Sequence, residues 1–224
     1  MVKLVVISDT HTQEKKLPII KADIVIHAGD FTYQGKSQEI KNFLDWYKEY
    51  PAEHRLLICG NHEETCDISH REYNLHCKDL ILNCQDITYL ENNEITIEGI
   101  KFYGTAWTPF FCRWGFGGKD IGGGEGARNL EDVYNEIPND TEVLIAHGPP
   151  YKILDKNLEN IYCGSKAMRK LLDSGKLSKL KLYLTGHIHE NKGQLEVDGV
   201  KYINASSVDR DYNLYPDPIT VVEF

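Results

Sequence analysis

Short apolar runs of strand length recur along the chain, with more polar stretches between them. The five clearest runs span residues 4–7, 24–28, 56–59, 143–146 and 182–185. Continuous apolar segments of this length are typical of strands that are buried on both faces. Between some of them, residues 36–50 and 167–172 place their apolar side chains on one face of a helix. The pattern therefore predicts alternating strands and helices.

Two further segments have the pattern of β-hairpins. Residues 95–103 and 195–203 each contain two short strands around a two-residue turn that ends in glycine. Residues 219–224 can add a strand at a sheet edge. Parallel strands and hairpins together predict an α/β fold of two mixed sheets with helices outside them, in one domain of residues 1–224.

Residues 108–128 break this pattern, because seven glycines alternate with aromatic side chains there. Long loops inside compact domains are often functional lids, so two predictions stay open: a mobile flap over a site, or a plain surface loop. The segment Gly118-Lys119-Asp120 departs from the phosphate-binding loop motif, which requires Ser or Thr after the lysine.

The overall charge limits the kinds of partner. The formal net charge is −9 at pH 7, and no run of Lys or Arg provides the basic stripe of nucleic-acid binders. Nucleic acid is therefore an unexpected partner, whereas a small anionic substrate stays compatible if some carboxylates bind cations. No stretch approaches the roughly 20 apolar residues of a membrane helix, and residues 2–7 are typical of a strand, not a signal peptide. The six cysteines form no C-x-x-C pair, so we expect reduced thiols and a cytoplasmic location.

Metal-ligand residue types follow each of the five apolar runs. In chain order these segments are Ser8-Asp9-Thr10-His11, Gly29-Asp30, Gly60-Asn61-His62, His147-Gly148 and Gly186-His187-Ile188-His189. Because ligands in open α/β sheets bind beyond the carboxyl ends of the strands, the five segments can converge. An isolated Asp or His there is more often a turn or packing residue, but turn chemistry does not explain five convergent segments.

The residue types at these segments indicate the kind of metal. Carboxylate and imidazole ligands suit Mn, Fe or Zn, and the lack of cysteine disfavours a structural thiolate zinc site. Glycines beside the ligands allow backbone and imidazole to approach closely. Glu63 and Glu190 adjoin ligand-bearing motifs, where a carboxylate can support a ligand. We assign His27 to packing inside a strand, and we expect the other histidines to be solvated, namely His54, His70 and His76.

These five motifs resemble those of the calcineurin-like metallophosphoesterases, and they extend from Asp9 to His189. Residues 26–32, 60–63, 107–116 and 147–150 are similar to the MPPED group of metallophosphodiesterases within that superfamily. The resemblance implies a four-layer α/β/β/α sandwich of two mixed β-sheets flanked by helices, with two divalent metal ions. One ion would be bound by Asp9, His11, Asp30 and His189, and the other by Asp30, Asn61, His147 and His187.

The resemblance also implies a mechanism. Asp30 would bridge the two ions together with a hydroxide, at the roughly 3.5–4 Å spacing of two-metal sites, and the hydroxide would attack phosphorus in line. His62, which binds neither ion, would be the general acid that protonates the leaving oxygen. By analogy with the family we expect Mn²⁺, with Fe, Zn and Mg as alternatives. Some MPPED members replace a metal histidine with glycine and lose activity, but both His187 and His189 are present here.

The substrate class is predicted from the absence of arginine beside the second and third motifs. Protein phosphatases of the superfamily carry arginine beside the second and third motifs, whereas residues 29–35 and 59–62 contain none. A phosphomonoester dianion needs more charge neutralised than a diester, and bidentate arginine usually provides it. Arg113 and Arg128 are the nearby replacements. We therefore predict hydrolysis of small phosphodiesters, cyclic nucleotides among them.

Two other functions use the same residues. A metal-binding interaction module could keep the fold without the activity, although the presence of His62 favours catalysis. A nuclease could stack bases on the aromatic side chains of residues 110–116, although single-strand nucleases usually combine stacking with a basic groove, and this chain is acidic.

Overall fold

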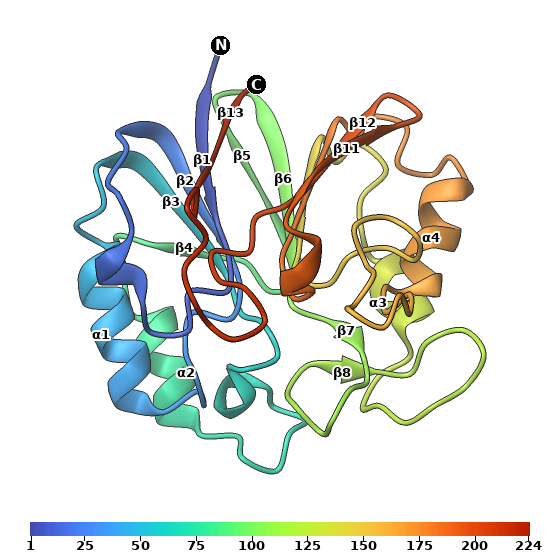
Figure 1. Cartoon of the computed structure of the whole chain (residues 1–224), viewed down its shortest axis with the longest axis horizontal. Helices are drawn as coiled ribbons and strands as arrows, with labels where there is room; N and C mark the ends of the chain where they lie inside the picture. Colours follow the sequence, from blue (N-terminus) through green and yellow to red (C-terminus); the bar gives the residue numbers. More distant parts are fainter.

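The strands form two mixed sheets in the computed structural model, which describes residues 1–224 (Figure 1). The first sheet has the order β13 (Thr220–Glu223), β1 (Lys3–Ile7), β2 (Ala22–Ala28), β3 (Ala52–Ile58) and β4 (Thr88–Tyr89). The second has the order β11 (Gly193–Val197), β12 (Val200–Asn204), β10 (Leu182–Thr185), β9 (Val143–Ala146), β6 (Ile100–Thr105) and β5 (Asn93–Ile97). All neighbouring strands are parallel except for the edge strands β13, β11 and β5, which pair antiparallel.

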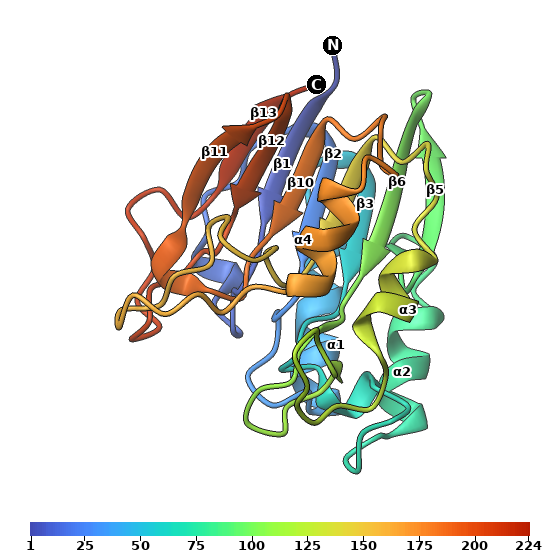
Figure 2. The same cartoon turned by 90° about the vertical axis from the view of Figure 1, so that its right-hand side faces the viewer.

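Helices cover the outer faces of both sheets (Figures 1 and 2). Helices α1 (Ser37–Tyr47) and α2 (Leu75–Leu82) lie outside the first sheet, and α3 (Leu130–Asn135) and α4 (Lys166–Asp173) lie outside the second. Short 3-10 helices span Glu14–Lys16, Glu64–Cys66 and His189–Asn191. The order helix, sheet, sheet, helix confirms the predicted four-layer α/β/β/α sandwich. None of the helices has the length and apolar character that crossing a membrane requires.

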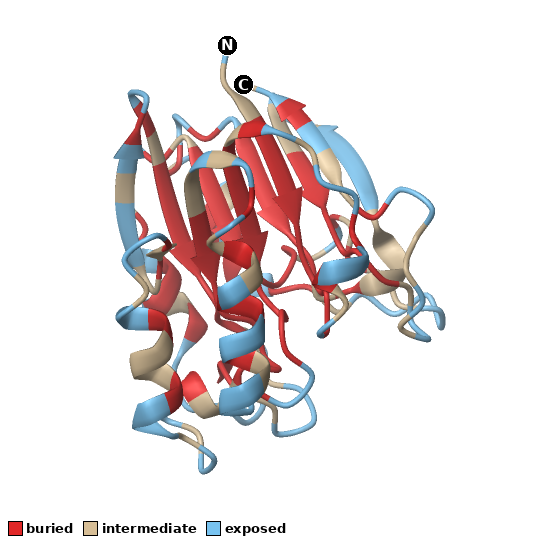
Figure 3. Cartoon of the chain, turned by 90° about the vertical axis from the view of Figure 1, so that its left-hand side faces the viewer, coloured by how far each residue is buried: buried red, intermediate tan, exposed pale blue.

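Side chains of the central strands alternate between two hydrophobic layers. In β1, Leu4 and Val6 join a core cluster that contains residues of both sheets, whereas Val5 and Ile7 join the cluster that contains helix residues such as Phe43. Burial on both faces explains why this strand is a continuous apolar run in the sequence. Figure 3 shows the consequence: the central strands are buried, and exposed residues lie on the edge strands and outer helix faces.

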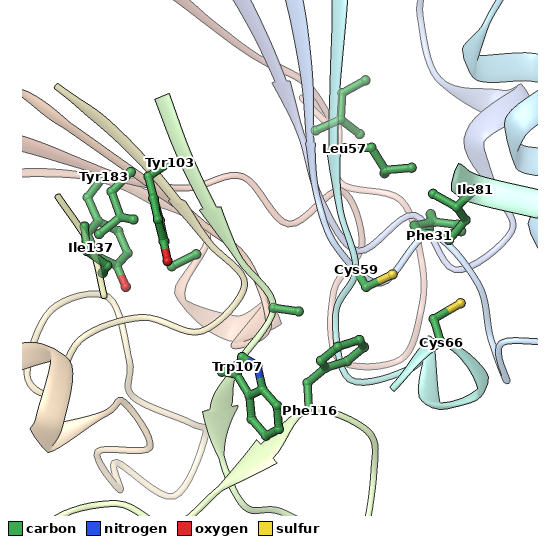
Figure 4. Packing of buried hydrophobic residues seen from close by; sticks show 14 of the residues in the cluster. Phe31, Leu57, Cys59, Cys66, Ile81, Tyr103, Trp107, Phe116, Ile137 and Tyr183 are labelled. Carbon is green, nitrogen blue, oxygen red and sulfur yellow. The ribbon is translucent and has the colours of Figure 1, made fainter. Parts of the chain in front are cut away.

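The helix-facing cluster continues beneath the carboxyl ends of the strands (Figure 4). Leu57 belongs to this cluster on the side of the first sheet and Tyr183 on the side of the second. Trp107 and Phe116 lie between them, with their ring centroids 5.9 Å apart in an edge-to-face arrangement. The chain that follows β6 is therefore anchored in the core.

The elements predicted from the apolar pattern are present, with corrected ends. All five apolar runs lie in strands, and both hairpins and the edge strand β13 are confirmed. The helix predicted over residues 36–50 ends earlier, at Tyr47; a proline at position 51 disfavours helical backbone at Tyr50. Helices α2 and α3 were not predicted. Only two residues of α2 are buried and α3 has six residues, so neither produces a clear apolar period.

The glycine-rich segment 108–128 is partly ordered into a small sheet. Strands β7 (Thr108–Pro109) and β8 (Gly117–Gly118) pair in parallel, and Phe116 is buried. The prediction of a plain surface loop is therefore wrong for these residues. Whether the segment moves as a flap stays a prediction.

Candidate metal centre

All seven predicted metal ligands lie beyond the carboxyl ends of β1, β2, β3, β9 and β10, six in loops and His189 at the start of a 3-10 helix. Three groups have ligand atoms that lie within 4.8 Å of one another: Asp9, His11 and His189; His11, Asp30 and His62; and Asp30, His147 and His187. Asn61 joins the last group, because its Oδ1 lies 3.0 Å from His147 Nε2. Asp30 belongs to two of the groups, so the structure brings the predicted ligands together around a shared carboxylate.

Backbone conformation at the site is unusual. The φ angles of Asp9, His11, Asp30 and His187 are 51°, 42°, 56° and 66°. L-amino acids in this left-handed region cost of the order of 1–2 kcal/mol each, and they persist where the surrounding structure holds them. Strain of this kind clusters at functional sites, which supports a functional role for these loops.

Two glycines permit the loops to approach one another. A Cβ atom at Gly60 would overlap Asp30 Oδ1 and would lie 2.6 Å from His147 Cε1. A Cβ at Gly186 would overlap Asp9 Oδ2. The absence of a side chain at both positions is therefore required for the carboxylates to lie where they do.

Backbone carbonyl groups orient the ligand imidazoles. The Nδ1 atoms of His11, His147 and His189 lie 3.1, 2.9 and 3.1 Å from the carbonyl oxygens of Thr32, Ala28 and Asp209. A carbonyl oxygen only accepts hydrogen bonds, so Nδ1 carries the proton in each ring. In the neutral imidazoles, Nε2 therefore keeps its lone pair and faces the site, which is the arrangement that second-sphere partners impose on metal-binding histidines.

The atoms that converge are mostly hydrogen-bond acceptors. Nε2 of His11 lies 3.3 Å from Nε2 of His189, and Nε2 of His147 lies 3.0 Å from Asn61 Oδ1 and 3.2 Å from Asp30 Oδ2. Facing lone pairs repel unless a proton or a cation lies between them. Oxygen and imidazole nitrogen atoms are ligands of divalent Mn, Fe and Zn, so these residues fit a pair of such ions.

Charges in the site match this fit. Burial opposes ionisation of Asp30, but the neighbouring His147 and His62 hold its pKa well below the usual range. Burial lowers the pKa of His147 and Asp30 raises it, with a net increase to about 9. Burial lowers the pKa of His11 to about 4 and that of His187 to about 3, so both rings are neutral. A cation beside Asp30 must displace the His147 proton, which makes metal binding dependent on pH.

His62 is held by its neighbours with Nε2 directed toward Asp30. Its Nδ1–H donates to the Tyr33 carbonyl oxygen at 2.8 Å, and Nε2 lies 4.0 Å from Asp30 Oδ2. Trp114 stacks on the imidazole, with ring centroids 4.1 Å apart and planes 25° apart. The glycine-rich segment therefore contributes directly to the position of the proposed general acid, which its sequence did not indicate.

Glu63 links the loops after β2 and β3. Its carboxylate oxygens accept hydrogen bonds from the backbone N–H groups of Asp30 at 2.9 Å, Thr32 at 2.8 Å and Gly60 at 2.7 Å, and from the Thr32 hydroxyl. The side chain is fully buried, and burial together with the charge of Asp30 raises the pKa of Glu63 to about 8. These hydrogen bonds are of the kind expected for a buried carboxyl group that positions the proposed ligand Asp30.

The contribution of the segment after β12 to the site was not predicted from the sequence. The Ser206 hydroxyl donates to Asp9 Oδ2 at 2.9 Å, and the Asp209 carbonyl accepts the His189 Nδ1–H. Tyr212 packs edge-to-face on His11 at 4.8 Å. These residues belong to no recognisable motif, and their roles depend on contacts with residues distant in the chain.

Other predicted residues have structural roles. His27 is fully buried in β2, and its Nε2 lies 3.1 Å from the Thr10 hydroxyl, as expected for a packing residue. The prediction that His70 is solvated is wrong, because its side chain is only 11% exposed and its Nε2 lies 2.8 Å from the Arg113 carbonyl oxygen. Arg128 pairs with Glu136 at 3.3 Å, so its guanidinium is engaged outside the site.

Comparisons with known proteins agree with this geometry. A family model described as calcineurin-like phosphoesterase matches residues 2–191. The human metallophosphoesterase domain-containing protein 1 is 31% identical over 242 aligned residues, which cover 98% of this chain and 70% of that protein. A UPF0046 protein of Caenorhabditis elegans is 30% identical over 228 residues, which cover 97% of this chain and 73% of that protein.

Solved structures share the fold at low sequence identity. The phosphopantetheinyl hydrolase of Mycobacterium tuberculosis has a TM-score of 0.66 at 14% identity, with 98% of this chain and 95% of that chain covered. A protein of Thermus thermophilus has a TM-score of 0.57 at 15% identity, with 96% and 97% covered. At this identity the likeness concerns the fold alone.

Proposed function

Because this chain belongs to the calcineurin-like phosphoesterase family, we propose that it is a two-metal phosphodiesterase that hydrolyses small phosphodiesters, cyclic nucleotides among them. When bound, two divalent cations supply a water of lowered pKa and neutralise charge on the phosphoryl oxygens. The observation that carries this proposal is the convergence of buried carboxylate and imidazole ligand atoms around Asp30, with Nε2 of His147 3.2 Å from Oδ2.

Each proposed ligand set is drawn from several loops. We assign Asp9, His11, Asp30 and His189 to one cation, and Asp30, Asn61, His147 and His187 to the other. Mn²⁺ is the expected metal, although the same oxygen and imidazole donors accept Fe, Zn or Mg. Metal analysis of the purified protein identifies the ion.

His62 is assigned as the general acid. Its Nδ1–H donates a hydrogen bond to the Tyr33 carbonyl oxygen, so Nε2 is the atom that would carry the proton for the leaving oxygen. Stacking on Trp114 keeps the ring plane in place while the proton is transferred. The proton ends on the departing oxygen. This oxygen is released as an alcohol from an acyclic diester, and it stays in the product as a hydroxyl group when a cyclic nucleotide is opened.

The preference for diesters rests on the lack of arginine in the loops after β2 and β3. Residues 29–35 and 59–62 contain no arginine, and Arg128 is paired with Glu136. Arg210 lines a cavity together with His187 and His189, so it lies beside the site but outside these two loops. A diester monoanion needs less charge neutralised than a monoester dianion, so the absence of arginine from the loops after β2 and β3 favours diesters. Bis-p-nitrophenyl phosphate is expected to be hydrolysed in the presence of Mn²⁺ faster than p-nitrophenyl phosphate.

The role of His62 is tested by the dependence on the leaving group. His62→Ala is expected to reduce hydrolysis of 3′,5′-cyclic AMP by about 10²- to 10⁴-fold, since an alkoxide leaves only when protonated. Hydrolysis of bis-p-nitrophenyl phosphate should fall less, because nitrophenolate needs no proton to leave. His76→Ala, at an exposed histidine, is the control and should behave like the unchanged protein. Equal losses on both substrates would exclude His62 as the acid.

Absence of turnover with every divalent ion, in a protein shown to bind two ions, would favour the metal-binding module over the enzyme.

We also propose that the chain functions as one domain of residues 1–224 in the reducing cytoplasm. All six cysteines are free, which supports that location.

A further inference from the structure

A cavity of about 540 Å³ lies beside the proposed metal centre. His187 and His189 belong to its wall, and Phe110 and Phe111 of the glycine-rich segment line it as well. Arg210 comes from the segment after β12. With Asn157 and Cys163, residues from four parts of the chain therefore enclose a space that reaches two proposed ligands. The proposed reaction assigns no role to this space.

We propose that this cavity, here termed the retained-group pocket, holds the part of a phosphodiester that stays attached to phosphorus, and that this part is a flat, uncharged heteroaromatic group such as the base of a nucleoside. The inference rests on the proposed phosphodiesterase function and adds the class of substrate.

The size of the pocket fits such a group. An engineered protein cavity of about 150 Å³ is sufficient to bind benzene, and ligand pockets commonly measure about 300–1,000 Å³. A volume of about 540 Å³ therefore accommodates a sugar with a base. A phosphate with a methyl substituent would leave most of the pocket filled with water.

The apolar part of the wall fits a flat ring. Phe111 is 61% exposed, although it is a large apolar side chain at the rim of a cavity. Covering it with an aromatic ring removes apolar surface from water and adds a ring-to-ring contact. Phe110 lines the same pocket, so a ring that enters meets aromatic surface there.

The charges in the wall disfavour a second phosphate. Arg210 and Glu190 both line the pocket, and their opposite charges offset one another. A guanidinium provides several N–H donors, and a carboxylate provides acceptors. An uncharged ring that carries both carbonyl and N–H groups matches this pair better than an anion does.

The position of His62 decides which part of the substrate enters. His62 contributes nothing to the pocket wall, whereas the leaving oxygen must reach its Nε2. The substituent in the pocket is therefore the one that remains on phosphorus. During hydrolysis of an acyclic diester the P–O bond to the other alcohol breaks, and that oxygen takes the proton of His62. In a cyclic nucleotide the bond that breaks joins phosphorus to a second oxygen of the same nucleoside, and that oxygen takes the proton. Water supplies the oxygen of the new P–O bond and the proton that restores His62. The product is the phosphomonoester of the group in the pocket.

Diesters that share one leaving group test this assignment. Methyl p-nitrophenyl phosphate and phenyl p-nitrophenyl phosphate both release nitrophenolate, so they differ only in the retained group. With Mn²⁺ present, the phenyl ester is expected to have a kcat/KM about fivefold to tenfold higher, mainly through a lower KM. The p-nitrophenyl ester of thymidine 5′-phosphate should exceed both, because its base can also bind Arg210.

Variants identify the residues responsible. Phe111→Ala should bring the ratio of kcat/KM for the phenyl and methyl esters close to one, and Arg210→Ala should reduce the advantage of the thymidine ester over the phenyl ester. Leu82→Ala removes a similarly exposed apolar side chain from α2 and should leave both ratios unchanged. Calorimetry gives a second readout without turnover: phenyl phosphate should bind more tightly than methyl phosphate, and Phe111→Ala should abolish the difference.

The outcomes separate this inference from the proposed function. Metal-dependent hydrolysis with equal kcat/KM for the methyl and phenyl esters, or a preference for phenyl that survives Phe111→Ala, overturns the retained-group pocket and leaves the phosphodiesterase intact. Failure to hydrolyse any of the three esters with any divalent ion overturns the proposed function, and the pocket assignment with it.

Discussion

The two halves of the proposed metal centre are held in place in different ways. In the half after β2 and β3, one carboxylate, Glu63, accepts backbone hydrogen bonds from Asp30 and Gly60. In the half after β10, the His187 backbone N–H donates to Asp9 at 3.0 Å, and the Ser206 hydroxyl donates to the same carboxylate. The first set of contacts spans 33 positions of the chain at most, whereas the second spans 178 and 197.

The difference concerns what each set of contacts stabilises. Glu63 is a buried acceptor for several backbone groups within one sheet, so its loss affects folding. Ser206 makes one bond to a proposed ligand and forms a β-bridge with Ser8, which follows the first sheet. Its loss is therefore expected to affect the orientation of Asp9 and the binding of metal. We therefore expect substitutions in the first half to reduce stability and substitutions in the second half to reduce metal affinity.

Glu63→Ala is expected to have the largest effect. Three buried backbone N–H groups and the Thr32 hydroxyl would lose their acceptor, and each unsatisfied group costs about 1–3 kcal/mol before relaxation or water entry. The free energy of unfolding should fall by about 3 kcal/mol or more in urea titrations of the metal-free protein. Glu64→Ala, at a partly exposed neighbour, is the control. A loss below about 1 kcal/mol for Glu63→Ala would show that the two halves do not differ in this way.

Ser206→Ala tests the second half. Removal of a partner that orients a ligand typically lowers metal affinity by about 10- to 100-fold, while the loss of one hydrogen bond costs only about 1 kcal/mol of stability. Calorimetric titration with Mn²⁺ measures the affinity. Ser207→Ala is a matched control, because Ser207 is equally buried but donates to the Pro218 carbonyl oxygen at 2.9 Å instead of to Asp9. Equal affinities in the two variants would contradict the role assigned to Ser206.

Lys192 supplies a dependence of stability on pH. Its Nζ donates to the Ser206 carbonyl at 2.9 Å, and burial lowers its pKa from 10.5 to about 8. Between these values the unfolded chain holds the proton and the folded chain does not, so this group makes the folded protein more stable as pH rises from about 8 to 10.5.

Replacement with methionine removes this dependence. The free energy of unfolding of the unchanged protein, relative to Lys192→Met, should therefore increase between pH 7.5 and pH 10. Urea titrations at both pH values measure it, with the exposed Lys179→Met as the control for loss of a surface charge. A relative stability that stays constant or decreases would contradict the burial of this ammonium group.

The positions of residues in the fold could be predicted from the sequence where they depend on a local pattern. Asp30 and His147 follow apolar runs, and the alternation of Leu4 and Val5 between two layers requires only that both faces of the strand are buried. The ends of elements were less predictable, as Tyr47 and the short helix α3 show. Helix ends depend on single contacts that do not repeat along the chain.

By itself, the sequence determined the α/β class, the two mixed sheets and the segments that meet at the carboxyl ends of the strands, because periodic burial and residues after strand ends are local properties. Only the tertiary structure decided that Trp114 stacks on His62, that Ser206 holds Asp9 and that Arg210 shares a cavity with His187. Those contacts join residues that are distant in the chain. The first two exist only once the two sheets have packed together, and no short pattern encodes that packing.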